Sequence, residues 1–590
     1  MEFKRLFDLL TNHVNENPNN LFLASKVNNK WKHYSFQEVQ QVANKVSQLL
    51  LSLNLQKDDK IAVIANNRPE WNFTDFGAQQ IGVTVVPMYP TISEHDYEYI
   101  FNDSEIKYAF VGDNTILQKV KPLLQKCTSL KGIYTFDETE DAKSFWSALP
   151  ENIDITAIEN IKATVTEDDL ATIIYTSGTT GNPKGVMLTH KNIVSNVISV
   201  KEVTPFVIGE KSLSFLPLCH SFERMVFYAY LCFGIHIHYA ESLETIADNL
   251  QEVKPYCFTT VPRLLEKVYE KIMAKGAALT GAKKLLFDWS MELGAQYEIG
   301  TNKGWCYNTQ LAIARKLVFS KWQEALGGNV HFIITGAAAM QPRLITLFTA
   351  AGVNVLEGYG LTETSPVLSC NLVDEKQRCI GTVGIPIPGV EIKMAEDGEI
   401  IAKGPNIMKG YYKRPDLTAE VIDKDGWFHT GDIGTWIEKN GNKFLKITDR
   451  KKELFKTAGG KYIAPQVIEN KMKESPYIEQ IMVVGGDDKK YISALIVPSF
   501  VQLTAWAEKN GVVVLSNEEL IKDKQVLSLL DKEIKKFNDN FGQWEQIKKF
   551  VALPNEWSVE SGELTPTMKP KRKIIAERYS KEINSIYAAD

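Results

Sequence analysis

The feature that most constrains the fold is a glycine-rich segment, residues 175–185, which follows the apolar, β-branched run of residues 171–174. The segment holds three glycines, four Ser/Thr hydroxyls and one lysine, Lys184. Glycines let the backbone approach a polyphosphate and turn its N–H groups inward, hydroxyls donate further hydrogen bonds, and a lysine adds a point charge. The pattern predicts a strand that runs into a loop for the phosphates of a nucleoside triphosphate.

This segment does not follow the Walker phosphate-loop pattern. Pro183 stands five positions after Gly178, where the second glycine of that pattern belongs, and Lys184 is followed by Gly185 instead of Ser or Thr. The segment on its own is also compatible with a polar surface loop that contains turn residues. Motifs elsewhere in the chain are needed to choose between a phosphate-binding loop and a polar surface loop.

The bulk properties exclude several classes of protein. A chain of 590 residues exceeds what one hydrophobic core usually serves, and 44% hydrophobic with 24% charged residues is typical of a globular protein. A net charge of −5 argues against a nucleic-acid partner. Seven cysteines without a CxxC pair, and no apolar run of membrane-spanning length, favour the reducing cytoplasm. Peripheral contact at the inner face of a membrane is still compatible with this composition.

The order of apolar segments predicts two α/β subdomains. Strand-like segments at residues 60–64, 82–87 and 108–111 alternate with helical patterns such as residues 35–53. A second series of strand-like segments, again separated by helix-length stretches, occupies residues 212–216, 256–260, 330–335 and 353–356.

The pattern changes near residue 381, where short strands and glycine turns predict a small β-rich module. The charged junction at residues 449–453 precedes strands at residues 481–484 and 492–497 and then helical patterns. We therefore expect an N-terminal domain over residues 1–448, a hinge over 449–453, and a small, mobile α+β domain over 454–590.

Candidate ligand-binding residues lie beyond predicted strand ends, where open α/β sheets bind their ligands. In residues 358–364, Tyr359 offers an aromatic face for a purine, Thr362 a hydroxyl for a phosphate, and Glu363 a carboxylate for Mg²⁺. Gly336, in a run of small residues, would let a flat base lie close to the backbone, although a helix N-terminus explains that run equally well.

Asp432 and Arg450 are candidates for holding a ribose. A carboxylate such as that of Asp432 can accept two hydrogen bonds from the ribose diol, and Arg450 has matching donors. Taken singly, each residue is more typical of a surface salt bridge.

Four segments together, residues 175–185, 358–364, 430–432 and 447–461, closely resemble the signature motifs of the AMP-forming adenylate-forming enzymes. The resemblance extends from Phe36 to about Lys573. Within that superfamily, residues 67–71, 216–224, 271–328 and 564–572 are similar to the long-chain fatty acid:CoA ligase branch.

The resemblance implies a two-step reaction. A fatty acid is activated with ATP and Mg²⁺ to an acyl-adenylate and pyrophosphate, and the acyl group then passes to coenzyme A with release of AMP. Alternatives are a ligase that delivers the adenylate to an acyl-carrier protein, a CoA ligase for a medium-chain or aryl carboxylate, and a non-catalytic acyl-nucleotide sensor. The presence of Lys184, Glu363, Asp432 and Arg450 argues against the sensor.

The resemblance also assigns roles to single residues. It implies that Glu363 binds Mg²⁺, Thr362 contacts the α-phosphate, Tyr359 and Gly336 frame the adenine, and Asp432 and Arg450 hold the ribose. The residues implied to hold the β- and γ-phosphates are Thr176, Ser177, Gly178, Thr179, Thr180 and Lys184.

Further roles concern the C-terminal part and the acyl side. The catalytic lysine of the family corresponds to Lys569 by its spacing from the later basic pair, with Lys571 as a rival because Met568 replaces the usual glycine. Lys452 corresponds to the hinge and His220 to the gate between acyl pocket and nucleotide, although a lone histidine is more often structural. Gly459 and Gly460 would line the tunnel for the pantetheine arm.

Overall fold

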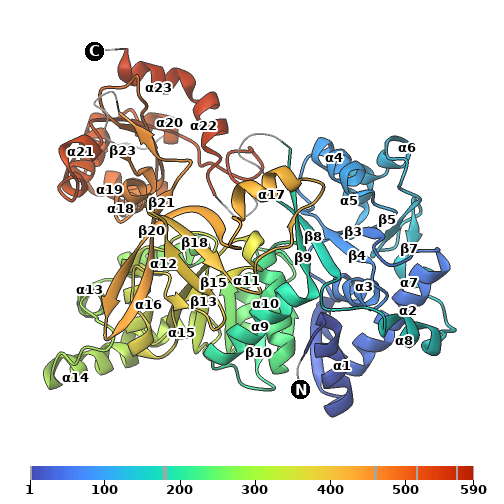
Figure 1. Ribbon diagram of the computed structural model, residues 1–590. Helices are drawn as coiled ribbons and strands as arrows, with labels where there is room; N and C mark the ends of the chain where they lie inside the picture. The colour runs from blue at the N-terminus through green and yellow to red at the C-terminus, as the bar shows by residue number, and fades with distance from the viewer. Residues whose placement is uncertain (1–2, 177–181, 458–461, 513–515, 566–568, 589–590) are drawn as a thin grey trace.

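The computed structural model describes residues 3–176, 182–457, 462–512, 516–565 and 569–588. Figure 1 shows an N-terminal α/β subdomain at the right in blue and teal, a second one at the lower left in green and yellow, and the C-terminal part above the second in orange and red. The predicted class, α/β with a smaller β-rich module and a C-terminal α+β domain, is confirmed.

The first sheet has the strand order β19-β9-β8-β4-β3-β5-β6-β7. Its central strands pair in parallel, with Ala62 opposite Val86 on one side and Ala109 on the other. Helices α4 (Glu94–Ser104), α5 (Asn114–Val120) and α6 (Leu123–Lys126) share a core with its outer face. The strands are β3 (Lys60–Ile64), β4 (Thr84–Pro87), β5 (Tyr108–Val111), β6 (Gly132–Thr135), β7 (Lys143–Ser144), β8 (Leu170–Thr176), β9 (Lys184–Thr189) and β19 (Gly410–Tyr411).

The second sheet has the order β16-β15-β14-β13-β12-β10-β11-β1-β2, and the run from β14 to β11 is parallel. The strands are β1 (Leu21–Val27), β2 (Lys30–Ser35), β10 (Lys211–Ser214), β11 (His236–Tyr239), β12 (Cys257–Thr260), β13 (Phe332–Thr335), β14 (Asn354–Gly360), β15 (Val367–Cys370) and β16 (Ile385–Pro386). The helices that contribute to a core on its outer face are α11 (Ile246–Val253), α12 (Pro262–Ala277), α13 (Gly281–Ala295), α14 (Trp305–Ala314), α15 (Ser320–Ala325) and α16 (Pro342–Ala350).

Two buried helices join the sheets. In α3 (Pro69–Gln79) every residue is buried, and α10 (Ser221–Phe233) is buried along nearly its whole length. Both contribute to one hydrophobic core that also takes residues from each sheet. Both helices bury polar as well as apolar side chains.

A polar cluster lies inside this core. Asp75 of α3 forms a buried ion pair with Arg224 of α10 and accepts a hydrogen bond from Tyr228. The other arm of Arg224 donates to the hydroxyl of Thr172 on β8 over 2.6 Å. Breaking such a pair from one side would leave a buried charge, at a typical cost of about 3–5 kcal/mol. The cluster therefore fixes α10 against the strand that precedes the glycine-rich loop.

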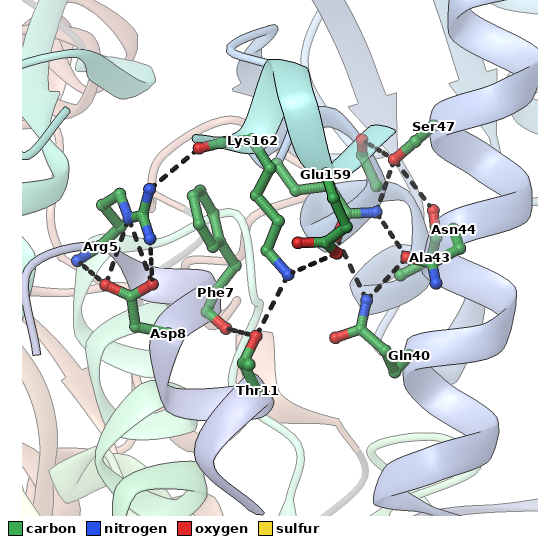
Figure 2. Close-up of polar contacts among 12 residues, drawn as sticks. Arg5, Phe7, Asp8, Thr11, Gln40, Ala43, Asn44, Ser47, Glu159 and Lys162 are labelled. Carbon is green, nitrogen blue, oxygen red and sulfur yellow. Dashed lines mark hydrogen bonds and ion pairs between the residues drawn. The ribbon is translucent and has the colours of Figure 1, made fainter. Parts of the chain in front are cut away.

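The N-terminal helix α1 (Leu6–Glu16) is tied to α8 (Ile155–Lys162), as Figure 2 shows. Arg5, which precedes α1, pairs with Asp8 at 2.8 Å and donates to the carbonyl of Lys162 over 2.9 Å. The amine of Lys162 in turn donates to Thr11 and to Glu159 over 3.3 and 3.2 Å. These contacts hold α1 against α8 at the edge of the N-terminal subdomain that lies away from the outer helices of the second sheet (Figure 1).

The helix predicted at residues 35–53 is α2 (Phe36–Ser52), and its start has a clear cause. The hydroxyl of Ser35 accepts from the backbone N–H of Glu38, whose carboxylate accepts from the N–H of Ser35 over 2.7 Å. This reciprocal cap satisfies donors that the first helical turn leaves unpaired. Helix α9 (His190–Val203) begins with the same device, through Thr189 and Asn192.

The β-rich module is an antiparallel sheet in the order β17-β18-β20-β21. Its strands are β17 (Glu391–Met394), β18 (Glu399–Lys403), β20 (Phe428–Lys439) and β21 (Asn442–Arg450). Because β21 continues to Arg450, the first two residues of the predicted hinge belong to a strand, and a turn follows at residues 451–453.

The C-terminal part has cores of its own, built from residues 455 onward. Its strands are β22 (Phe455–Lys456), β23 (Tyr462–Ile463), β24 (Ile478–Val484), β25 (Ser493–Pro498) and β26 (Lys549–Ala552). Its longer helices are α18 (Pro465–Met472), α19 (Phe500–Lys509), α21 (Lys524–Asn538), α22 (Arg572–Arg578) and α23 (Ser580–Tyr587).

Candidate functional site

The site residues gather where strands of both sheets end and the C-terminal part comes closest. Thr176 ends β8 and is paired with Lys184, the first residue of β9, so both ends of the glycine-rich loop lie side by side. Ser177, Gly178, Thr179 and Thr180 lie outside the described residues. Residues 358–360 were expected beyond a strand end, and this is wrong: β14 continues to Gly360 because it pairs there with β15.

Tyr359, Asp432 and Arg450 form one connected group. The hydroxyl of Tyr359, on β14, donates to Oδ2 of Asp432, on β20, over 2.6 Å. Arg450, opposite Asp432 in the register of β20 and β21, places Nε 3.4 Å from Oδ1. Burial raises the pKa of Asp432, and the guanidinium of Arg450 counteracts that rise. The group is a largely buried carboxylate between two donors, which is a suitable acceptor for a diol.

Glu363 is linked to the strand that carries Lys184. It lies in the short 3₁₀ turn η2 (Thr362–Thr364), directly after β14. The hydroxyl of Tyr411, on β19, donates to Oε1 of Glu363 over 2.9 Å, and Nζ of Lys184 lies 5.1 Å from the centre of the Tyr411 ring. Since β19 pairs with β9, Tyr411 stands between the lysine and the carboxylate.

Thr362 and His220 meet at the start of α10. The hydroxyl of Thr362 lies 3.2 Å from that of Ser221, the first residue of the helix. The ring of His220 caps α10, with Nδ1 accepting from the N–H of Phe222 over 3.1 Å. Burial and then the charge of Lys569 lower the pKa of His220 to about 4. The imidazole is therefore neutral at pH 7, and its ring caps α10.

Gly336 follows β13 and lies against the same corner. A Cβ atom at this position would come within 3.5 Å of the Phe222 ring and 3.6 Å of the carbonyl oxygen of Gly358. The backbone of Gly336 is thus bordered by an aromatic ring and by the strand that carries Tyr359. The alternative interpretation of this run, a helix N-terminus, is wrong, since α16 starts at Pro342.

Lys569 reaches this group from the C-terminal part. Its backbone is held by Thr565, whose hydroxyl accepts from the N–H of Lys569 over 3.0 Å. Burial, and then the charge of Arg450, lower the pKa of Lys569 to about 8, while Asp432 and Glu363 act in the opposite direction. Lys569 is therefore within electrostatic range of residues from β20, β21 and η2.

The rival Lys571 lies directly before α22 and donates its backbone N–H to Glu563 over 2.7 Å. Lys452 is exposed in the turn after β21. Gly459 and Gly460 lie outside the described residues.

Sequence reasoning missed several residues that shape the site. Tyr411 and Ser221 are ordinary residues in the sequence, and only the fold brings them to Glu363 and Thr362. Glu357, two positions before Tyr359, is buried, its Oε1 accepts from the N–H of Met340 over 3.2 Å, and burial raises its pKa to about 8. The signal was a charged residue within an apolar strand pattern.

The described residues combine cationic groups, hydroxyls and a few carboxylates around one corner. Such a site can bind a polyphosphate, hold a ribose and stabilise negative charge at a phosphorus atom. Within the described residues no group of three or more His, Cys, Asp or Glu side chains is arranged to hold a metal by itself. Glu363 is the carboxylate that Tyr411 links to the strand of Lys184.

Comparison with known proteins identifies the family. The model of the AMP-binding enzyme family matches residues 10–412, and that of the AMP-binding enzyme C-terminal domain matches residues 453–590. The chain is 33% identical to long-chain-fatty-acid–CoA ligase 1 of Cavia porcellus, over 100% of this chain and 87% of that protein. It is 31% identical to long-chain-fatty-acid–CoA ligase FadD15 of Mycobacterium bovis, over 98% of this chain and 96% of that protein.

Solved structures have the same fold. The adenylation domain of a carboxylate reductase from Mycobacterium chelonae superposes with a TM-score of 0.74 at 21% identity, covering 99% of this chain and 91% of that one. The A domain of the carboxylic acid reductase from Segniliparus rugosus, in complex with AMP and a co-purified carboxylic acid, has a TM-score of 0.73 at 19% identity, with coverages of 99% and 94%. On the full-length matches in sequence, the chain belongs to the AMP-binding enzyme family, in the branch of the long-chain-fatty-acid–CoA ligases.

Proposed function

We propose that this protein is a long-chain fatty acid:CoA ligase that forms AMP. The observation that carries the proposal is the 31–34% identity, over nearly the whole chain, to relatives that are named long-chain-fatty-acid–CoA ligases. The convergence of Lys569, Asp432 and Arg450 at one corner supports the same function.

In the first step a carboxylate oxygen of the fatty acid attacks the α-phosphorus of ATP, and the bond to pyrophosphate breaks. Both reactants are anionic, so the step depends on cations and on positioning. We assign Lys569 and Thr362 to the α-phosphate, and Asp432 with Arg450 to the ribose. Tyr359 and Gly336 would border the adenine. Lys184 and the residues from Thr176 to Thr180 would hold the outer phosphates.

The residues present fit Mg²⁺. This ion is usually held by one or two carboxylates together with substrate phosphates and water. Glu363 offers such a carboxylate: Tyr411 donates to its Oε1, which orients the group toward the strand of Lys184. When bound, the ion would neutralise charge on the phosphates, while Glu363 holds it.

In the second step the thiolate of coenzyme A attacks the acyl carbonyl carbon, and AMP leaves. We propose that the C-terminal domain first rotates about the turn that contains Lys452, withdrawing Lys569. Gly459 and Gly460 would then border the path of the pantetheine arm. His220, neutral and half-buried, is suited to separate the acyl chain from the nucleotide by its bulk.

The experiment that tests this function measures AMP release from ATP and Mg²⁺ with fatty acids of increasing chain length, with and without coenzyme A. Turnover that requires coenzyme A and is highest with long chains is the expected result. Pyrophosphate release that coenzyme A does not increase would redirect the proposal to an acyl-carrier acceptor. A maximum with medium-chain or aryl acids would change the substrate class.

We also propose a cytoplasmic location with peripheral contact to an anionic membrane surface. All seven cysteines, each within the described residues, are unpaired. None of the helices in the described residues is both long and apolar enough to cross a bilayer. On α14 and the π turn η1 (Arg315–Phe319), however, Trp305 is 83% exposed and Leu317 52%.

These apolar side chains lie in a basic segment. Residues 271–328 hold eight Lys or Arg against four Asp or Glu, in a chain whose net charge is −5. Exposed Trp and Leu beside lysines are suited to the headgroup region of an anionic bilayer. The wild-type protein should float with vesicles that contain anionic lipid. The double variant Trp305→Glu/Leu317→Glu should not. Ile208→Glu, at an apolar residue that is 75% exposed in another part of the molecule, is the matched control.

A further inference from the structure

A contact between the two domains centres on Arg263, at the start of α12. Its guanidinium forms an ion pair with Glu479, on β24 of the C-terminal part, and lies 3.7 Å from Glu556. Arg263 is 17% exposed and the Glu479 side chain only 6%. Nearby, Arg343 donates to the carbonyl of Glu474 over 3.4 Å. None of these residues has a role in the two chemical steps described above.

The contact has more negative than positive charge. From its own helix, Arg263 also faces Glu266 at 3.7 Å and Glu270 at 3.8 Å. The remaining charged groups at this contact are Glu479, Glu556 and Lys473 from the C-terminal part and Arg343 from α16. The Arg263 guanidinium thus lies between carboxylates from both domains and favours their approach.

The strand that Arg263 holds is connected to Lys569. Gln480, next to Glu479, exchanges hydrogen bonds with the backbone of Trp557, over 3.1 and 2.7 Å. Trp557 shares a small core with Leu564, and Leu564 bridges to Pro570, the residue after Lys569. A shift of β24 relative to α12 would therefore move the segment that delivers the lysine to the site.

We propose that Arg263 is a positioning residue, which holds the C-terminal domain in the arrangement that delivers Lys569 and must release Glu479 before the second step. The inference rests on the proposed function, because it assumes that the two steps use different domain arrangements. Arg263 acts through the position of Lys569 and touches no reacting atom.

The carboxylates make this contact sensitive to pH. Burial first, and then the Glu479 carboxylate, raise the pKa of Glu270 to about 7. A carboxyl group whose pKa is raised in the docked arrangement stabilises that arrangement when protonated, and this contribution is lost as the pH rises through about 7. The contact should be tighter at pH 6 than at pH 8.

The test compares Arg263→Ala with Lys267→Ala, an exposed lysine on the same helix. Pyrophosphate exchange should fall about tenfold in Arg263→Ala, within the usual range of conformational coupling. Thioester formation from added acyl-adenylate should be unchanged or faster. The charge-swapped pair Arg263→Glu/Glu479→Arg should recover exchange. Equal loss of both partial reactions, or no recovery by the swap in a folded protein, would overturn the proposal.

A second readout does not depend on activity. Trypsin cleavage at the exposed turn of Lys451 and Lys452 reports how readily the domains separate. Cleavage should be faster in Arg263→Ala than in Lys267→Ala. For the pH dependence, the cleavage rate of the wild type divided by that of Glu270→Gln should rise between pH 6 and pH 8. An unchanged cleavage rate in Arg263→Ala would contradict the domain contact, whereas a wild-type protein without either partial reaction would contradict the proposed function.

Discussion

The rate of the proposed adenylation step should depend directly on the charge of Lys569. Burial, and then the guanidinium of Arg450, lower its pKa to about 8. Only the protonated amine stabilises negative charge at the α-phosphate, so kcat/KM for ATP in pyrophosphate exchange should fall as the pH rises through about 8. In the profile of kcat the same fall should occur at higher pH, because bound phosphates favour the protonated amine.

Substitutions at Lys569 and Lys571 decide whether this pH dependence belongs to the assigned lysine. Lys569→Arg keeps a positive charge whose pKa lies far above 8, so the fall near pH 8 should disappear. Lys569→Ala should lower exchange by roughly 10²–10³-fold, as for loss of one group that stabilises transition-state charge. Lys571→Ala should retain both the rate and the fall. A fall that persists near pH 8 in Lys569→Arg would assign the titration to another group.

At the level of the elements, the pairing of β14 with β15 positions the residues that follow it. A Cβ atom at Gly360 would lie 1.7 Å from the carbonyl oxygen of Pro366, whereas one at Gly358 would lie 3.6 Å from that of Ser369. We predict that Gly360→Ala separates the two strands, lowers stability by about 3 kcal/mol and displaces Glu363. Thermal unfolding and pyrophosphate exchange measure the two effects.

Gly358→Ala is the matched control for stability, since it adds the same methyl group to the same strand at an ordinary contact distance. Its unfolding midpoint should lie much closer to that of the wild type. Similar midpoints for the two variants would mean that the backbone around Pro366 yields, and that the strand pairing does not fix the turn of Thr362 and Glu363.

Some of these elements could be predicted from local sequence patterns, and others could not. The strands at residues 60–64 and 108–111 and the capped helix α2 follow from patterns within a few residues. The extension of β14 through Gly360 depends on β15, and the orientation of Glu363 on Tyr411, 48 residues later. Tertiary packing determines such partners, and the local spacing of residues carries no information about it.

Local sequence patterns were also insufficient to identify which C-terminal lysine corresponds to the catalytic lysine of the family. The spacing from the later basic pair favoured Lys569, but Lys571 stayed a rival because Met568 replaces the usual glycine. In the structure Lys569 lies within electrostatic range of Asp432 and Arg450, whereas Lys571 directly precedes α22. The distinction depends on how two separately formed cores meet, and this is a property of the whole molecule.

Across the whole molecule, rigid contacts flank the turn at residues 451–453. Asp449, which is buried, accepts from the N–H groups of Arg450 and Gln466 over 2.6 and 3.2 Å. Arg572 pairs with Glu453 at 2.9 Å and with Glu469 at 2.6 Å. The hydrogen bond from Gln466 to Asp449 crosses the turn and would have to break in a rotation, whereas Arg572 fixes Glu453 to the C-terminal part. We therefore expect a rotation between the domains to be concentrated in the exposed turn around Lys452.

Restricting the backbone at Lys452 should therefore separate the two partial reactions. Proline fixes φ near −65°, so Lys452→Pro should retain pyrophosphate exchange in the arrangement seen here. Formation of acyl-CoA from added acyl-adenylate should fall about tenfold or more, because the domain can no longer rotate. Lys452→Ala, which removes the side chain and leaves the dihedral angles free, should support both reactions. If proline slowed both reactions equally, the turn would be a structural connection and the rotation would have to occur elsewhere in the chain.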